Sequence, residues 1–321
     1  MNIHRPTGHW QYGLMLSILT ALLFGILPIV LQGLLSSLDV ITITWFRFGV
    51  AVLLLAIVVA RKNGLSQAFR LRGFKLLLLF LAVTGLCGNF ALYLWGLEFV
   101  SPSTVQVVIQ AAPKFLLIGS LAIFRESFST LQGLGLITLI IGLILFFNQR
   151  YSEILSGAGS LLPGILITIA AAASWAIYAL SQKQLLKSLP SESIMFLIYL
   201  AGSLIFLPFS HPTELFQLSR LQSALLTLCA LITLISYLSF AEALDHIEAS
   251  RVGVVLATTP LITVAGMTFL APMLPDLLKP EELNSLSLAG ALLVMIGSML
   301  GSIGAIGRSE DSAETSRATS K

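Results

Sequence analysis

Residues 76–97 read LLLLFLAVTGLCGNFALYLWGL, and this run contains no charged side chain. Its length matches the roughly 20 residues that an α-helix needs to cross the hydrocarbon core of a bilayer. Residues 12–31 and 221–241 are also long apolar runs without a charge. A strand of a membrane barrel would alternate polar and apolar residues over roughly ten positions, whereas these runs are apolar on every face. The three runs therefore predict an all-α membrane protein.

The composition of the whole chain agrees with this interpretation. Of its 321 residues, 56% are hydrophobic and 10% are charged, whereas charged residues make up about 25% of a soluble domain. The net charge of +3 is spread over the connections, so the sequence predicts no nucleic-acid partner. Cys87 and Cys229 lie within apolar runs, where we expect them to pack as small side chains rather than to form a disulfide. The pattern predicts neither a bound metal nor a cofactor.

Ten apolar segments are expected to span the membrane. The first follows a short basic stretch but has no small-residue cleavage site, so we expect it to be retained as a span. Short connections indicate that helices adjacent in the chain are also neighbours in the bundle. The expected spans are residues 12–31, 40–60, 74–97, 102–124, 131–147, 161–181, 193–208, 221–244, 249–271 and 286–306.

Positive charges determine the expected orientation. With the N-terminus inside the cell, thirteen lysines and arginines fall on the inner side and three on the outer side, as the positive-inside rule requires. We therefore expect both termini and the connection 61–75 to be cytoplasmic and the connection 272–285 to be external. For a bacterial protein the membrane would be the plasma (inner) membrane. The tail 308–321, rich in small polar and charged residues, is expected to be disordered and solvated.

The two halves of the chain repeat each other. A displacement of 147 residues places Pro113 on Pro260 without a gap. Residues 1–150 and 151–307 are therefore expected to form two repeats of five spans each. Because five is odd, the second repeat must enter the membrane upside down relative to the first. Further matches are Ser103 with Ser250, Val105 with Val252, and the pair Gly135 and Gly142 with the pair Gly290 and Gly297.

Inverted repeats are typical of secondary transporters, whose substrate site lies near the middle of the membrane where helices are interrupted. Pro113 follows the expected helix start near Pro102 by eleven residues, which is a rise of roughly 17 Å at 1.5 Å per residue. Pro260 lies equally deep in its own span. Each proline removes a backbone donor and frees a carbonyl. The two prolines therefore either mark a central site or are ordinary kinks of membrane helices.

Four motifs of the first half are typical of a known family. They are YLWGLEFVSPST at residues 93–104, QAAP at 110–113, FRE at 124–126, and the spaced glycines Gly135 and Gly142. With these motifs the chain resembles the EamA-type transporters of the drug/metabolite transporter superfamily over residues 12–306. The resemblance implies two five-helix repeats, cytoplasmic termini and movement of a small organic solute. The chain departs from the family in the long connection 272–285, which leaves no counterpart of Glu126, and in Phe24-Gly25, where the family often has Trp-Gly.

Two ionisable side chains are expected inside the membrane, where a charge is costly and is a candidate for function. Lys114 directly follows Pro113, whereas Arg47 is expected nearer the outer end of its span, where it can extend to the surface. Gln106 and Gln110 share the helix face of Lys114. The expected substrate-binding residues are Lys114, Gln110, Gln106, Asn89, Tyr93, Trp175, Tyr178, Thr258 and Thr259.

The charge of Lys114 has no obvious partner in the sequence, because the acidic residues lie at or near span ends. A buried ammonium needs a partner or must lose its proton. Glu242 could reach it, carbonyls and water could satisfy it, it could be neutral, or the substrate could bring the negative charge. We take the last as our hypothesis, with an amino acid or organic acid as the solute. The pattern Gly297-x-x-x-Gly301 predicts close helix packing within the bundle or in a dimer.

The sequence therefore predicts a secondary transporter, expected to be an exporter, that moves a small amino-acid-like or otherwise acid-bearing metabolite by alternating access. A membrane scaffold or receptor without transport activity would leave the repeat and the prolines unexplained. An integral membrane enzyme needs catalytic groups at one depth, but the four histidines are scattered over termini and connections. A channel would need a selectivity filter or a ring of like charges. The expected partners are the solute and membrane lipid, with the protein a monomer or a homodimer.

Overall fold

The computed structural model describes residues 9–61, 72–115, 118–119, 129–157, 159–186, 188–247, 249–278, 281 and 283–318. Within these residues the chain is α-helical and contains no strand. The bilayer explains this choice, because its core offers no water to unpaired backbone groups and an α-helix satisfies them within one segment. Large apolar side chains such as Leu53, Phe80 and Phe269 are exposed on the bundle, as expected where lipid rather than water surrounds it.

The order of the helices follows the expected spans. In the first half they are α1 (Trp10–Gln32), α2 (Val40–Arg61), α4 (Phe74–Phe99), α5 (Pro102–Val108), the 3-10 turn η1 (Ile109–Ala111) and α7 (Thr130–Phe146). A short helix, α8 (Tyr151–Ser156), precedes the second half. There they are α9 (Leu161–Leu185), α10 (Ser191–Phe206), the 3-10 turns η2 (Leu207–Phe209) and η3 (Pro212–Gln217), α11 (Arg220–His246), α12 (Ala249–Leu256), α13 (Thr259–Leu270) and α14 (Ser285–Ala318).

Eight stretches of the described residues are long and apolar enough to cross a membrane. They are α1, α2, α4, α9, α10 with η2, α11, α12 with α13, and α14. The expected fifth span corresponds to α7, which is apolar but has only 17 residues. The expected fourth span, 102–124, begins as α5 and η1 and extends beyond the described residues.

The C-terminal helix is longer than the expected span 286–306. α14 continues to Ala318, so it includes most of the tail 308–321 that we expected to be disordered. No proline interrupts this segment, and its alanines, serines and glutamates are all compatible with a helix. Several of the lysines and arginines counted for the orientation lie outside the described residues, as does Glu126. They are Arg5, Lys62, Arg70, Arg125, Lys187, Lys279 and Lys321.

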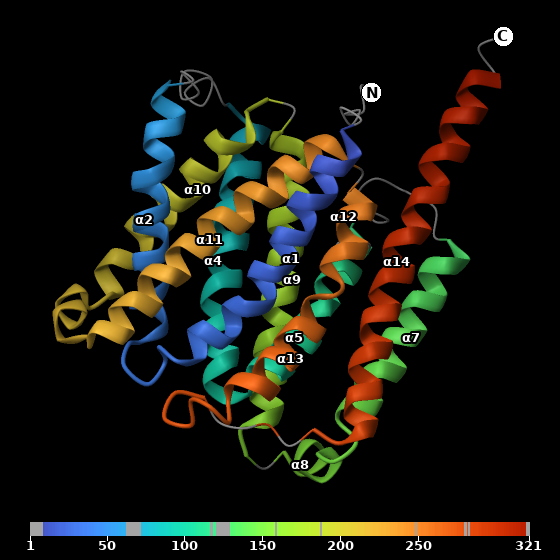
Figure 1. The fold of residues 1–321 in the computed structure, drawn as a ribbon. Helices are drawn as coiled ribbons and strands as arrows, with labels where there is room; N and C mark the ends of the chain where they lie inside the picture. The colour runs from blue at the N-terminus through green and yellow to red at the C-terminus, as the bar shows by residue number, and fades with distance from the viewer. Residues whose placement is uncertain are drawn as a thin grey trace.

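Helices from the two halves pack against each other in pairs (Figure 1). The first span of the first half, α1, packs against α11, the third span of the second half. In the same way α9, the first span of the second half, packs against α4, the third span of the first half. The pairs α2 with α10 and α7 with α14 join corresponding spans. The packing is thus reciprocal, and the start of α1 and the end of α14 lie at the same end of the bundle (Figure 1).

Glycines bring α7 and α14 into backbone contact. A Cβ atom added at Gly142 would lie 2.8 Å from the carbonyl oxygen of Gly290, and one added at Gly135 would lie 2.6 Å from the nitrogen of Gly301. Only glycine allows so close an approach of two backbones. The close packing expected from Gly297 and Gly301 therefore occurs within the bundle, between two antiparallel helices.

Both spans that contain a central proline are interrupted. α5 ends at Val108 and continues as the 3-10 turn η1, whereas α12 ends at Leu256 just before α13 begins. A proline cannot donate a hydrogen bond to the carbonyl four residues earlier, and its ring crowds that carbonyl. For Pro113 this carbonyl belongs to Ile109, and for Pro260 it belongs to Leu256. Each regular helix ends at this point, so the two interruptions occupy matching positions of the repeat.

Candidate functional site

The glutamines of the interrupted fourth span are buried between helices. Gln106 and Gln110 lie one helical turn apart, in α5 and η1 respectively. The amide oxygen of Gln106 accepts a hydrogen bond from the hydroxyl of Tyr93 (2.9 Å). Its amide nitrogen donates to the carbonyl of Phe24 (3.2 Å). Gln106 therefore connects α5 to both α4 and α1.

Gln110 makes the corresponding connection to the last two spans. Its amide nitrogen donates to the hydroxyl of Thr259 (3.2 Å), and its amide oxygen accepts from the hydroxyl of Ser298 (3.0 Å). The neighbouring hydroxyl of Thr258 donates to the carbonyl of Val255 (2.7 Å), inside the interruption between α12 and α13. Hydrogen bonds from Gln110 therefore join the two interrupted spans to each other and to α14.

Lys114 is buried although it carries an ionisable group. Its side chain is 6% exposed, and its ammonium nitrogen donates to the carbonyl of Gly297 on α14 (3.0 Å). Glu242 lies instead 3.4 Å from His246. In the part of the chain that the structure describes, no carboxylate lies within ion-pair distance of Lys114. An ammonium has three donors, so a single carbonyl leaves capacity for a ligand.

Among the described residues, no hydrogen bond joins Asn89, Trp175 or Tyr178 to this row of polar groups. Asn89 donates to the carbonyl of Ala171 (3.0 Å) and so joins α4 to α9. Trp175 and Tyr178 lie on α9 with their ring centroids 6.4 Å apart, and both belong to an aromatic cluster described next. The residues of the row are Tyr93, Gln106, Gln110, Lys114 and Thr259.

An aromatic cluster joins α1, α2, α4, α9, α10 and α11. Phe48 lies 4.8 Å from Phe90, and Phe90 lies 5.7 Å from Tyr237, measured between ring centroids. The sequence analysis did not single out Tyr199 or Tyr237, because both lie in apolar runs. The displacement of 147 residues does place Phe90 on Tyr237, and this match was the signal that could have found the second tyrosine. The aromatic cluster consists of Phe24, Phe48, Phe90, Trp175, Tyr178, Tyr199 and Tyr237.

Arg47 extends into the aromatic cluster. Its side chain is 2% exposed, and its Nε donates to the hydroxyl of Thr233 on α11 (2.9 Å). The guanidinium carbon lies 4.6 Å from the ring centroid of Phe90, a geometry that favours a cation–π interaction. Arg47 therefore does not extend to the surface, although its expected position would allow it, because α4 and α11 enclose its side chain. Among the described residues no carboxylate forms an ion pair with it.

Glu281 is a half-buried acid that the sequence analysis did not single out. It lies in the connection before α14, and its Oε1 accepts a hydrogen bond from the backbone N–H of Ser103 at the start of α5 (3.2 Å). Burial raises the pKa of this carboxyl above its ordinary value, although hydrogen bonds from Ser103 oppose the shift. Beside Glu281, a cleft of about 460 Å³ is lined by residues of α5, α7 and α14. Glu281 therefore connects the loop before α14 to the start of the interrupted fourth span.

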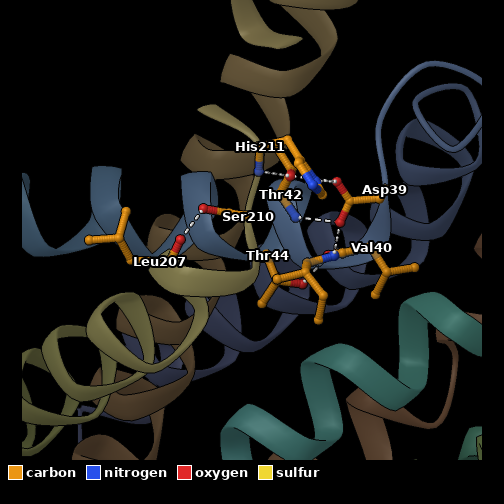
Figure 2. Close-up of polar contacts among 8 residues, drawn as sticks. Asp39, Val40, Thr42, Thr44, Leu207, Ser210 and His211 are labelled. Carbon is orange, nitrogen blue, oxygen red and sulfur yellow. Dashed lines mark hydrogen bonds and ion pairs between the residues drawn. The ribbon is translucent and has the colours of Figure 1, made fainter. Parts of the chain in front are cut away.

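A second polar contact joins the α1–α2 connection to the α10–α11 connection (Figure 2). Asp39 accepts hydrogen bonds from the backbone N–H groups of Ile41 and Thr42 and lies 3.3 Å from Nδ1 of His211. Burial disfavours the charge of Asp39, but the hydrogen bonds from Thr42 hold its pKa below the ordinary value. Carboxylate oxygens of Asp39 and Glu214 and a ring nitrogen of His211 lie within 4.8 Å of one another and could hold a metal ion.

Comparison with known proteins places the chain in a family and identifies its fold. A model of the EamA-like transporter family matches residues 11–148 and again residues 162–303. The uncharacterized inner membrane transporter YhbE of Escherichia coli is 34% identical over 296 residues, which cover 91% of each chain. A probable amino-acid metabolite efflux pump of Salmonella typhimurium is 26% identical over 216 residues, 65% of this chain and 71% of the pump. One crystal structure matches 91% of this chain and 97% of its own with a TM-score of 0.61, and at 16% identity it shows the fold alone.

Proposed function

The chain belongs to the EamA-like transporter family, and we propose that it is a secondary transporter that exports a small acid-bearing metabolite. It is a multi-pass membrane protein, and its relatives include an inner membrane transporter. One observation carries the proposal about the charge of the solute. Lys114 and Arg47 are both buried, and among the described residues neither pairs with a carboxylate. A charge inside a membrane bundle is costly and is usually retained for function.

A solute with a carboxylate would supply the missing negative charge. The attraction between the carboxylate and a buried cation is far larger in a low-dielectric site than in water. Desolvation of both ions offsets much of it, which leaves a net benefit of roughly 2–4 kcal/mol for a well hydrogen-bonded pair. An amino acid or another organic acid meets this requirement. The efflux pump among the relatives supports both the direction of transport and the class of solute.

Alternating access between two inverted halves is the mechanism that we propose. The reciprocal packing of α1 with α11 and of α9 with α4 supports such a repeat, with five spans in each half and ten in all. The matching interruptions before Pro113 and Pro260 support a solute path between the halves. The proposed binding residues are those predicted from the sequence, namely Lys114, Gln110, Gln106, Asn89, Tyr93, Trp175, Tyr178, Thr258 and Thr259.

The orientation that we propose has both termini in the cytoplasm. An even number of spans is consistent with the start of α1 and the end of α14 lying at one end of the bundle (Figure 1). The lysines and arginines that gather on the inner connections determine which end this is. The glycines Gly297 and Gly301, which could have marked a dimer, are occupied by α7 within one chain, which favours a monomer.

Counterflow of radiolabelled amino acids and organic acids in proteoliposomes tests the proposal. We expect saturable exchange of at least one carboxylate by the wild type. Lys114→Gln should lower this exchange at least tenfold, because an unpaired carboxylate in the site costs a few kcal/mol. Lys114→Arg should restore it in part, since the planar fork needs more room than an ammonium. Lys75→Gln is the matched control, because Lys75 is exposed at the start of α4.

The same assay separates the competing functions. Flux without saturation would indicate a pore, and no flux of any solute would indicate a scaffold or receptor. Chemical alteration of the solute would indicate an enzyme. Saturable transport of organic cations but not of carboxylates would refute the proposed substrate class. Normal exchange by Lys114→Gln would instead assign Lys114 a structural role.

A further inference from the structure

The guanidinium of Arg47 carries donors that the protein does not use. In the described part of the chain its one hydrogen bond runs from Nε to Thr233. The two terminal nitrogens carry four more N–H donors in a planar fork, and an arginine cannot shed its charge by losing a proton. The side chain is 2% exposed, so bulk water does not compensate for the missing acceptors. A buried arginine in this state needs an acceptor from elsewhere.

The hydroxyl of Tyr199 needs the same acceptor. Tyr199 is fully buried on α10, and its hydroxyl has no hydrogen-bond partner among the described residues. Phe48, which directly follows Arg47 on α2, lies 5.1 Å from Tyr199 between ring centroids. Arg47 on α2 and Tyr199 on α10 therefore place their unused donors at the same aromatic cluster. A carboxylate has two oxygens, which fit a guanidinium fork in a bidentate pair and can also accept from a hydroxyl.

The aromatic cluster determines what kind of group can be attached to the bound carboxylate. Tyr237 lies 5.4 Å from Phe24 and 5.7 Å from Phe90, and Phe48 lies 5.1 Å from Tyr199, measured between ring centroids. Rings at such distances and tilted angles accept a further ring in an edge-to-face or offset arrangement. The aromatic side chains near Arg47 therefore favour a solute with an aromatic ring over a small polar one.

The charges around Arg47 also discriminate against an α-amino group. An ammonium one carbon away from a bound carboxylate would lie beside the guanidinium and would need an acid as its partner. Among the described residues, no carboxylate forms an ion pair with Arg47, and its guanidinium contacts the hydroxyl of Thr233 and the ring of Phe90. Like charges repel, and an unpaired ammonium also loses its hydration. We propose that Arg47 and Tyr199 bind the carboxylate of an aryl carboxylic acid that has no adjacent ammonium, with its ring held by the aromatic cluster.

This inference rests on the proposed transport function and narrows its substrate class. Its test is binding to the purified full-length protein in detergent, measured by calorimetry with three probes of similar shape. We expect 3-phenylpropanoate to bind at least tenfold more tightly than L-phenylalanine and than the neutral 3-phenylpropanol. The amino acid tests the ammonium, and the alcohol tests the carboxylate.

Variants assign the binding to the named groups. Arg47→Gln should weaken binding of 3-phenylpropanoate at least thirtyfold, because it removes a charged partner from a buried pair. Tyr199→Phe keeps the ring and should weaken binding severalfold without affecting binding of the alcohol, so it provides a test even if Arg47→Gln does not fold. Arg72→Gln, at an exposed arginine before α4, should bind like the wild type.

Two outcomes would overturn the inference. One is equal or tighter binding of L-phenylalanine, and the other is unchanged binding of 3-phenylpropanoate by Tyr199→Phe and by any folded Arg47→Gln. Proteoliposome exchange then tells which proposal has failed. Exchange of a non-aromatic carboxylate that is unaffected by Arg47→Gln would leave the transport function intact and refute only this site. Absence of any carboxylate exchange would refute both.

Discussion

Replacement of glycine by alanine is expected to lower the stability of the protein at Gly142, in the contact between α7 and α14, and to raise it at Gly49, on α2. Gly142 lies in this contact, where an added Cβ would be 2.6 Å from the nitrogen of Val294 and 2.8 Å from the carbonyl oxygen of Gly290. Gly49 lies on α2, where the nearest atom to an added Cβ is the hydroxyl oxygen of Ser203 at 3.8 Å. The first site has no room for a methyl group, whereas the second does.

The two effects have different magnitudes. In a helix alanine is favoured over glycine by about 1 kcal/mol, so Gly49→Ala should stabilise the protein by about 0.5–1 kcal/mol. At Gly142 the helices must separate by roughly 0.5–1 Å, which forfeits a quarter to a half of the dispersion energy at each affected contact. Overpacking of this kind costs about 1–3 kcal/mol. After the gain in helix propensity, a net destabilisation of up to about 2 kcal/mol is expected for Gly142→Ala.

Thermal unfolding in detergent, followed by circular dichroism, measures both variants. At about 2–4 °C per kcal/mol for a chain of this class, Gly142→Ala should lower the Tm by several degrees and Gly49→Ala should raise it slightly. The substitution is identical in the two variants, so effects of alanine itself cancel. Equal shifts, or a stabilised Gly142→Ala, would refute the inference that glycine is required for contact between these backbones.

Three further predictions concern topology, pH and the interrupted spans. In a background without native cysteines, an impermeant thiol reagent should label Asp276→Cys on intact cells but Lys75→Cys only after permeabilisation, and the reverse pattern would contradict the orientation. Because burial raises the pKa of Glu281, its protonated form stabilises the fold at acid pH. The wild type should therefore lose Tm relative to Glu281→Gln as the pH rises from the ordinary glutamate range through the raised value, and a constant difference would argue against that shift. Pro260→Ala should restore a donor to the carbonyl of Leu256 and lower exchange severalfold without lowering the Tm, whereas unchanged exchange would show that the interruption is dispensable for transport.

Much of the helix arrangement could be predicted from the sequence. The ends of α1, α2 and α4 lie within two residues of the expected spans. Apolar runs can be read this reliably because the bilayer core forces every lipid-exposed segment to satisfy its own backbone. The interruption of the fourth and ninth spans likewise follows from a local rule, since a proline affects the carbonyl four residues earlier.

The contacts of the candidate site were less predictable. The shared face of Gln106 and Gln110 follows from helical periodicity, and the structure places both in one polar row. The partner of Lys114 could not be found in this way, because it is the backbone carbonyl of Gly297, and a backbone acceptor is present at every residue. Sequence spacing therefore identified the polar side chains but not their partners.

Arg47 shows most clearly what only the tertiary structure decides. The sequence by itself determined that this arginine lies within an apolar helix, and that a charge there needs a reason. Its depth along α2 suggested that the side chain could extend to the outer surface. The structure instead encloses it between Phe90 of α4 and Thr233 of α11, helices that are distant in the sequence. Composition determines which segments enter the membrane, whereas the rotation and pairing of packed helices determine which side chains meet, because those depend on contacts between segments far apart in the chain.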